Sequence, residues 1–112
     1  MRVAAGGLVR ATSGLNFRAG RGTNHERLAV LVKDVLLHSL EGIVDGWVYA
    51  RLYGWQLGKS SELLFDPYAT ATKKATLTGG VATVVAKDGQ WNLVTLDGYV
   101  SSKHIVAVDG PN

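Results

Sequence analysis

The sequence DGWVYARLYGW occupies residues 45–55, and WNLVTLDGY occupies residues 91–99. Each copy has a tryptophan, a Gly-aromatic pair seven residues after it, and a lysine twelve residues after it. These residues are Trp47, Gly54-Trp55 and Lys59 in the first copy and Trp91, Gly98-Tyr99 and Lys103 in the second. A pattern that recurs at a fixed distance indicates two related structural units.

Short alternating segments around both copies predict β-strands. In residues 15–18, Leu15 and Phe17 alternate with Asn16 and Arg18, as in a strand with one buried face. Further strands are expected at residues 3–12, 47–52, 81–86, 91–96 and 104–108. Turns are expected at Ser13-Gly14, Asp45-Gly46, Tyr53-Gly54, Lys87–Gly89 and Asp97-Gly98. In the second half of the chain, this succession of short strands and turns is typical of a small, partly open barrel.

Residues 25–40 fit two interpretations. Residues 23–26 have the form of a capping box, and the apolar residues that follow have helical spacing, which favours a helix. The valine-rich runs at 29–32 and 35–37, separated by Lys33-Asp34, equally describe two strands joined by a polar turn. Local periodicity does not decide between them.

Composition restricts the class of protein. The chain has 112 residues, of which 46% are hydrophobic and 19% charged, so it is globular rather than disordered. It has no cysteine, which excludes disulfides and thiolate metal sites. The net charge is +3, and the excess of Lys and Arg lies within residues 1–65. This excess favours an anionic partner, such as a bacterial wall or nucleic acid, although a solvated surface explains it more simply.

No apolar run is long enough to cross a membrane, and the stretch after Met1 is too short for a signal peptide. We therefore expect no membrane partner. The expected location is the cytoplasm as made, or the outside after release by lysis.

Several motifs in residues 11–64 resemble a bacterial SH3 domain (SH3b, type 3). They are LNFRAGRGT at 15–23, the apolar segment 30–37, Gly46-Trp47, Gly54-Trp55 and Leu63-Leu64. The chain departs from the pattern at Arg21, where the family usually has proline, and at Gln56-Leu57, where it has Val-Ser. Residues 69–106 resemble a second, degenerate copy that lacks the opening segment and its long loop. The resemblance implies a short helical turn near 24–28 followed by strands.

The resemblance implies an all-β fold of two small SH3-like β-barrels in tandem, the second truncated in its first loop. The expected domains are residues 1–66 and 67–112, with a boundary at Asp66-Pro67. Members of this family commonly hold peptidoglycan hydrolases, including phage endolysins and autolysins, on the cell wall. The implied function is non-catalytic binding of peptidoglycan, through its peptide or cross-bridge part, at the bacterial wall. Implied partners include a catalytic domain or further copies of the chain.

The alternatives are a protein-interaction or assembly module and, less favoured, a nucleic-acid-binding barrel. For any of them, we expect an extended ligand in a groove between the 19–28 loop and a Trp47–Trp55 hairpin. The predicted ligand-binding residues are Arg18, Arg21, Asn24, Trp47, Tyr49, Tyr53 and Trp55. Aromatic faces stack on sugars and peptide planes, and guanidinium groups bind carboxylates. The competing roles are packing in the core for Trp47 and Trp55, and support of the loop for Asn16.

Catalysis is not predicted. The three histidines lack the spacing of metal ligands, and Asp45, Asp88 and Asp97 each precede glycine, which indicates turns. Gly20 and Gly22 are too few and too close for a phosphate-binding loop. We therefore expect neither enzymatic activity nor a cofactor nor a metal.

Overall fold

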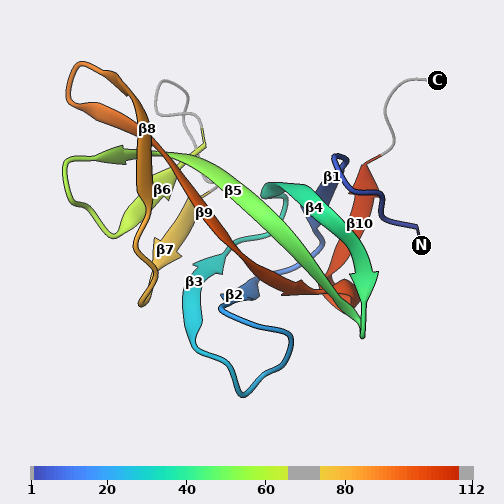
Figure 1. Cartoon of the computed structure of the whole chain (residues 1–112). Coiled ribbons are helices and arrows are strands. Elements are labelled where there is room, and N and C mark those ends of the chain that lie inside the picture. The colour runs from blue at the N-terminus through green and yellow to red at the C-terminus, as the bar shows by residue number, and fades with distance from the viewer. Residues whose placement is uncertain (1, 66–73, 109–112) are drawn as a thin grey trace.

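The structure is a computed structural model that describes residues 2–65 and 74–108. The described part is all-β, with one turn of 3-10 helix, η1 (Ser102–His104), before the last strand (Figure 1). Its strands are β1 (Leu8–Ala11), β2 (Leu15–Arg18), β3 (Arg27–Leu31), β4 (Leu36–Val44), β5 (Trp47–Leu57), β6 (Glu62–Leu64), β7 (Lys74–Leu77), β8 (Thr83–Asp88), β9 (Trp91–Ser101) and β10 (Ile105–Val108). The predicted all-β class is therefore confirmed.

Six of these strands close into a barrel. Their order is β5-β6-β7-β3-β2-β9, and β9 pairs with β5 to complete the ring. The sheet continues from β5 through β4 and β1 to β10, while β8 adds to β9 on the other side. All pairings between neighbouring strands are antiparallel.

The two copies of the Trp and Gly-aromatic pattern pair with each other. β5 and β9 run side by side through the molecule (Figure 1), in register from Trp47 opposite Ser101 to Leu57 opposite Trp91. At the centre of this two-stranded ribbon, Leu52 lies opposite Leu96. These two leucines are separated by the same 44 residues as Trp47 and Trp91. The repeat therefore has a local two-fold axis through the Leu52–Leu96 pair, and each motif fills one strand of the ribbon.

The turns expected at Tyr53-Gly54 and Asp97-Gly98 are wrong, because both pairs lie inside long strands. Neither glycine has a positive φ. Both are needed for close packing instead. A Cβ at Gly98 would lie 2.6 Å from Phe17 Cε2, and a Cβ at Gly54 would lie 3.0 Å from Leu63 Cβ. The glycines mark places where the barrel interior leaves no room for a side chain.

The turn expected at Asp45-Gly46 is confirmed. Both residues have positive φ angles, 53° and 79°, which suits the two-residue turn of a twisted hairpin between β4 and β5. A strict two-residue connection fixes the register of the flanking strands, so Trp47 begins β5 directly opposite Val44.

Residues 25–40 form two strands, β3 and β4, and not a helix. The helical turn implied near 24–28 is wrong, because β3 already begins at Arg27. A tight turn lies just before it, where the His25 amide donates to the Gly22 carbonyl at 3.3 Å. Tertiary pairing decides the conformation, since β3 has β2 on one side and β7 on the other.

The core fills the barrel and continues under β1, β4 and β10, with alternate strand residues directed into it. In β2 the residues Leu15 and Phe17 are buried, and in β3 the residues Ala29 and Leu31 are buried. The largest fully buried apolar side chains are Phe17, Leu31, Leu37, Leu52 and Leu63. The opposite face of β5 therefore turns its tryptophans and tyrosines outward.

The expected boundary at Asp66-Pro67 lies outside the described residues, so the division into residues 1–66 and 67–112 stays a prediction. Strands from both sides of this point pair with each other. β1 pairs with β10, β3 with β7, and β5 with β9. Among the residues that the structure describes, no helix is long and apolar enough to span a membrane.

Candidate functional site

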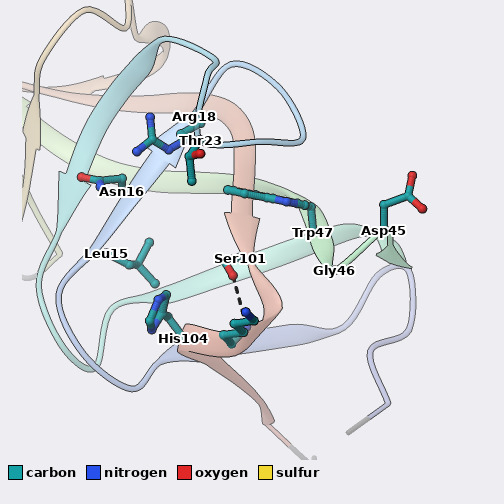
Figure 2. A pocket seen from close by; sticks show the side chains of 10 residues that line it. Leu15, Asn16, Arg18, Thr23, Asp45, Gly46, Trp47, Ser101 and His104 are labelled. Atoms are coloured by element: carbon teal, nitrogen blue, oxygen red, sulfur yellow. Dashed lines mark hydrogen bonds between the residues drawn. The ribbon is translucent and has the colours of Figure 1, made fainter.

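A cleft of about 420 Å³ opens at the Trp47 end of the ribbon. It lies between β2 with the loop that follows it on one side and the β4–β5 turn with η1 on the other (Figure 2). Its lining residues are Leu15, Asn16, Arg18, Thr23, Asp45, Gly46, Trp47, Ser101, Lys103 and His104. Figure 2 shows the Trp47 indole directed toward Thr23 and Arg18, while the Asp45 carboxylate points outward beyond Gly46.

Strand β2 supplies one wall of the cleft. Its alternation buries Phe17 and leaves Asn16 and Arg18 at the surface, where both line the cleft. Arg18 also supports the loop, because its Nη1 donates to the His25 carbonyl at 3.0 Å. Support of the loop was expected from Asn16. The structure gives Arg18 such a bond and places both side chains on the cleft.

Arg21 lies on the adjoining part of the loop and is held by the protein itself. Its Nη2 donates to Glu41 Oε2 at 2.6 Å, and its guanidinium carbon lies 4.8 Å from the centroid of the Tyr99 ring. Its Nε is buried and has no hydrogen-bond partner. Asn24 is exposed on the same loop and is absent from the lining of the cleft. The loop therefore covers the part of the β5–β9 ribbon that contains Tyr99.

The four predicted aromatic residues of β5 share its outer face but do not form one site. Trp47 lines the cleft. Tyr49 packs against Tyr99 with ring centroids 4.7 Å apart. The Tyr53 and His38 rings pack edge to face with their centroids 5.0 Å apart, and Trp55 lies opposite Leu93. Because Trp47–Trp55 is one continuous strand and not a hairpin, these side chains extend along a line away from the cleft.

The Arg51–Asp97 pair occupies the middle of this outer face. Arg51 Nε and Nη2 donate to the two Asp97 oxygens at 2.7 and 2.9 Å, which is a bidentate ion pair. The hydrogen bonds to Asp97 raise the pKa of Arg51. Burial raises the pKa of Tyr49, and the nearby Asp97 carboxylate raises it further. The two charges at the centre of the ribbon thus neutralise each other.

The second half of the cleft was not predicted from the sequence. Ser101, Lys103 and His104 follow the second copy of the motif, and the β5–β9 pairing brings them beside Trp47. The Ser101 hydroxyl accepts the Lys103 amide at 3.4 Å and so begins η1. The repeated lysine at position 103 was the available signal. Lys103 indicates the second side of the cleft only once the pairing of the two motifs is known.

The cleft combines an indole surface with groups of both charges. Arg18 and Lys103 are cations, and Asp45 is an anion at the outer rim. In the described part of the chain, no three His, Asp or Glu residues gather in a way that suits a metal ion. The arrangement suits the binding of a small zwitterionic or peptidic group, with apolar contact on the indole.

Comparison with known proteins gives no match, because no protein family, curated protein or solved structure resembles the chain significantly.

Proposed function

We propose that the chain is a non-catalytic module that binds bacterial peptidoglycan, with the peptide part of the wall in the cleft at Trp47. The cleft itself carries the proposal. It is a concave site with one large aromatic surface and charged groups of both signs around it. Such a module targets an attached or associated endolysin or autolysin to its substrate.

The chemistry of a wall peptide complements these groups. A short peptide of the wall presents free carboxylates, backbone amides and, in many walls, a free amine. Arg18 and Lys103 suit a carboxylate, Arg18 with the planar donors of its guanidinium. Asp45 suits an amine at the rim, and the Trp47 indole suits the flat peptide unit between them. We expect weak affinity for one site, so that attachment in pairs strengthens binding through effective concentration.

For the fold, we propose two SH3-like units that exchange their closing strands. Each motif lacks a turn in its middle, at Tyr53-Gly54 and Asp97-Gly98, so two short strands merge into one long strand that pairs with the other copy. Correspondingly, β1 pairs with β10 and β6 pairs with β7. Loss of a hinge turn is a recognised route to exchanged elements. An experimental structure in which residues 53–57 fold back on residues 47–52 would overturn this.

A pull-down with purified sacculi tests the function. We expect the wild-type chain to sediment with the wall and Trp47→Ala and Lys103→Met to remain largely in the supernatant. Val108→Thr is the control, because Val108 lies in β10 and is absent from the lining of the cleft. Circular dichroism establishes that each variant is folded.

Two results would replace the proposal. If the wild-type chain stays in the supernatant with sacculi of several wall types, binding to peptidoglycan is wrong. If binding to sacculi falls steeply with salt and DNA competes for it, the cations act on phosphates and a nucleic-acid function takes its place.

A further inference from the structure

The local two-fold axis gives the ribbon a second aromatic surface at the end away from the cleft. It relates Trp47 to Trp91 and Tyr99 to Trp55, since each pair is 44 residues apart. The outer face of this end, called the open half, consists of Tyr53, Trp55, Leu57, Trp91, Leu93 and Thr95. These residues form three successive cross-strand pairs, so they make one continuous surface.

The two halves differ in what covers them. Over the first half, the loop of residues 19–26 brings Arg21 onto the Tyr99 ring. In the second copy, the connection from β7 to β8 consists of residues 78–82 and is shorter than the 19–26 loop. In the described part of the chain, no cation lies over Trp55 or Trp91. Leu57 is 46% exposed and Tyr53 is 38% exposed. Trp55 and Trp91 are half-buried. The open half therefore offers a partly exposed apolar surface where the first half offers a cleft.

We propose that the open half binds a neutral linear glycan, the sugar backbone of the wall, beside the peptide bound in the cleft. This inference rests on the proposed function, because it assumes that the ligand is a polymer in which sugar and peptide are joined. The open half and the cleft belong to the same β5–β9 ribbon, whose last rung, Trp47 and Ser101, lines the cleft. One wall fragment can therefore contact both.

The chemistry of the open half favours sugar rings. Alternate residues of a strand lie about 7 Å apart, so Tyr53, Trp55 and Leu57 present apolar surface at regular intervals. Aromatic faces stack on the apolar face of a sugar, while the hydroxyls of Tyr53 and Thr95 can bond to its edges.

Charge argues against a polyanion at this surface. None of the six positions of the open half is charged. The nearest charged rung of the ribbon is Arg51 with Asp97, which are joined by two hydrogen bonds, and Arg51 also interacts with the Tyr53 side chain at the edge of the open half. Binding of nucleic acid requires cations along the backbone path, beside the aromatic surface. A neutral polymer matches this face better.

Titration with a soluble β-1,4-linked hexamer of N-acetylglucosamine, followed by NMR, tests the proposal. We expect shifts in the indole signals of Trp55 and Trp91, and binding about tenfold weaker in Trp55→Ala, which corresponds to the loss of one stacking contact. Leu57→Lys is the second variant, because Leu57 is exposed and lies outside the buried core. Val108→Thr, at 37% exposure, is the matched control for loss of exposed apolar surface.

The outcomes separate this inference from the proposed function. If a soluble wall peptide binds and the hexamer does not, the glycan site is wrong and the peptide site stands. If the hexamer binds and sacculi do not, glycan recognition stands and the wall assignment is wrong. Unchanged hexamer affinity in both Trp55→Ala and Leu57→Lys would also overturn the inference. So would a dimer of the wild-type chain, seen by light scattering, that Trp55→Ala converts to monomer, since the surface would then be an interface between copies.

Discussion

Replacement of Gly98 tests the long β9 strand more sharply than any other single change. A Cβ at this position would lie 2.6 Å from Phe17 Cε2, 2.9 Å from Phe17 Cδ2 and 2.8 Å from the Arg18 carbonyl oxygen. The ring is fully buried and the carbonyl belongs to β2, so neither can move aside easily. We therefore expect Gly98→Ala to destabilise the protein strongly.

The expected loss of unfolding free energy is the cost of overpacking minus the gain in backbone entropy. Overpacking of a buried site costs up to about 3 kcal/mol, and contact with backbone puts this site at the upper end. Replacement of glycine by alanine in a strand recovers about 1 kcal/mol of backbone entropy. The expected net loss is about 2 kcal/mol of unfolding free energy, or roughly 8 °C in Tm for a chain of this size.

Two other glycines serve as matched controls. Gly54 is the counterpart of Gly98 in the repeat, but its Cβ would only approach Leu63 Cβ at 3.0 Å, so Gly54→Ala should cost clearly less. Gly89 has a φ of +61° and nothing within 4 Å of an added Cβ. Gly89→Ala should therefore cost about 1 kcal/mol through conformation alone. Urea denaturation and thermal unfolding measure all three variants.

The relative stability of two variants at position 98 shows whether Gly98 lies in a strand or in a turn. In a strand packed against Phe17, Gly98→Asn is worse than Gly98→Ala, because asparagine is larger. In a left-handed turn, which the preceding Asp97 would favour, asparagine is tolerated better than alanine. A Gly98→Asn variant more stable than Gly98→Ala would refute the described course of β9.

Two further predictions concern the ribbon and the core. Because the pKa of Tyr49 is raised in the folded state, its contribution to stability is complete below pH 10, the ordinary value, and is lost as the pH rises above it. Spectrophotometric titration should show that Tyr49 ionises at a higher pH than an ordinary tyrosine. Asp97→Asn should lower the Tyr49 pKa, and an unchanged pKa would show that Asp97 does not act on Tyr49. Leu63→Ala should lower the unfolding free energy by about 2–4 kcal/mol, since Leu63 is 1% exposed and lies against Gly54, and a loss below 1 kcal/mol would place β6 outside the core.

Local patterns predicted much of the fold. The alternation in residues 15–18 and the Asp45-Gly46 turn were interpretable because each depends on neighbours in the sequence. Gly54 and Gly98 were misread as turns, because a glycine that permits a positive φ and a glycine that permits close packing look alike in the sequence. The choice depends on Leu63 and Phe17, which lie elsewhere in the chain.

The candidate site also contains some residues that were predicted from the sequence and some that were not. Arg18 and Trp47 were named as candidates because a groove was expected between the 19–28 loop and the Trp47–Trp55 segment, and both line the cleft. Ser101, Lys103 and His104 were missed, although they make up the facing side of the cleft. Only the antiparallel register of β5 and β9 brings them to Trp47, and no local pattern specifies which strands pair.

The pairing of β5 with β9 also has a consequence for the synthesis of the chain on the ribosome. β5 is complete once Leu57 has been made, but its partner begins only at Trp91, and β1 meets its partner β10 only after Ile105 has been made. Until then the growing chain presents its longest strand with one edge unpaired, which is a template for unwanted association. Closure of the barrel therefore waits until β9 has been made, and contacts so distant along the sequence make it slow.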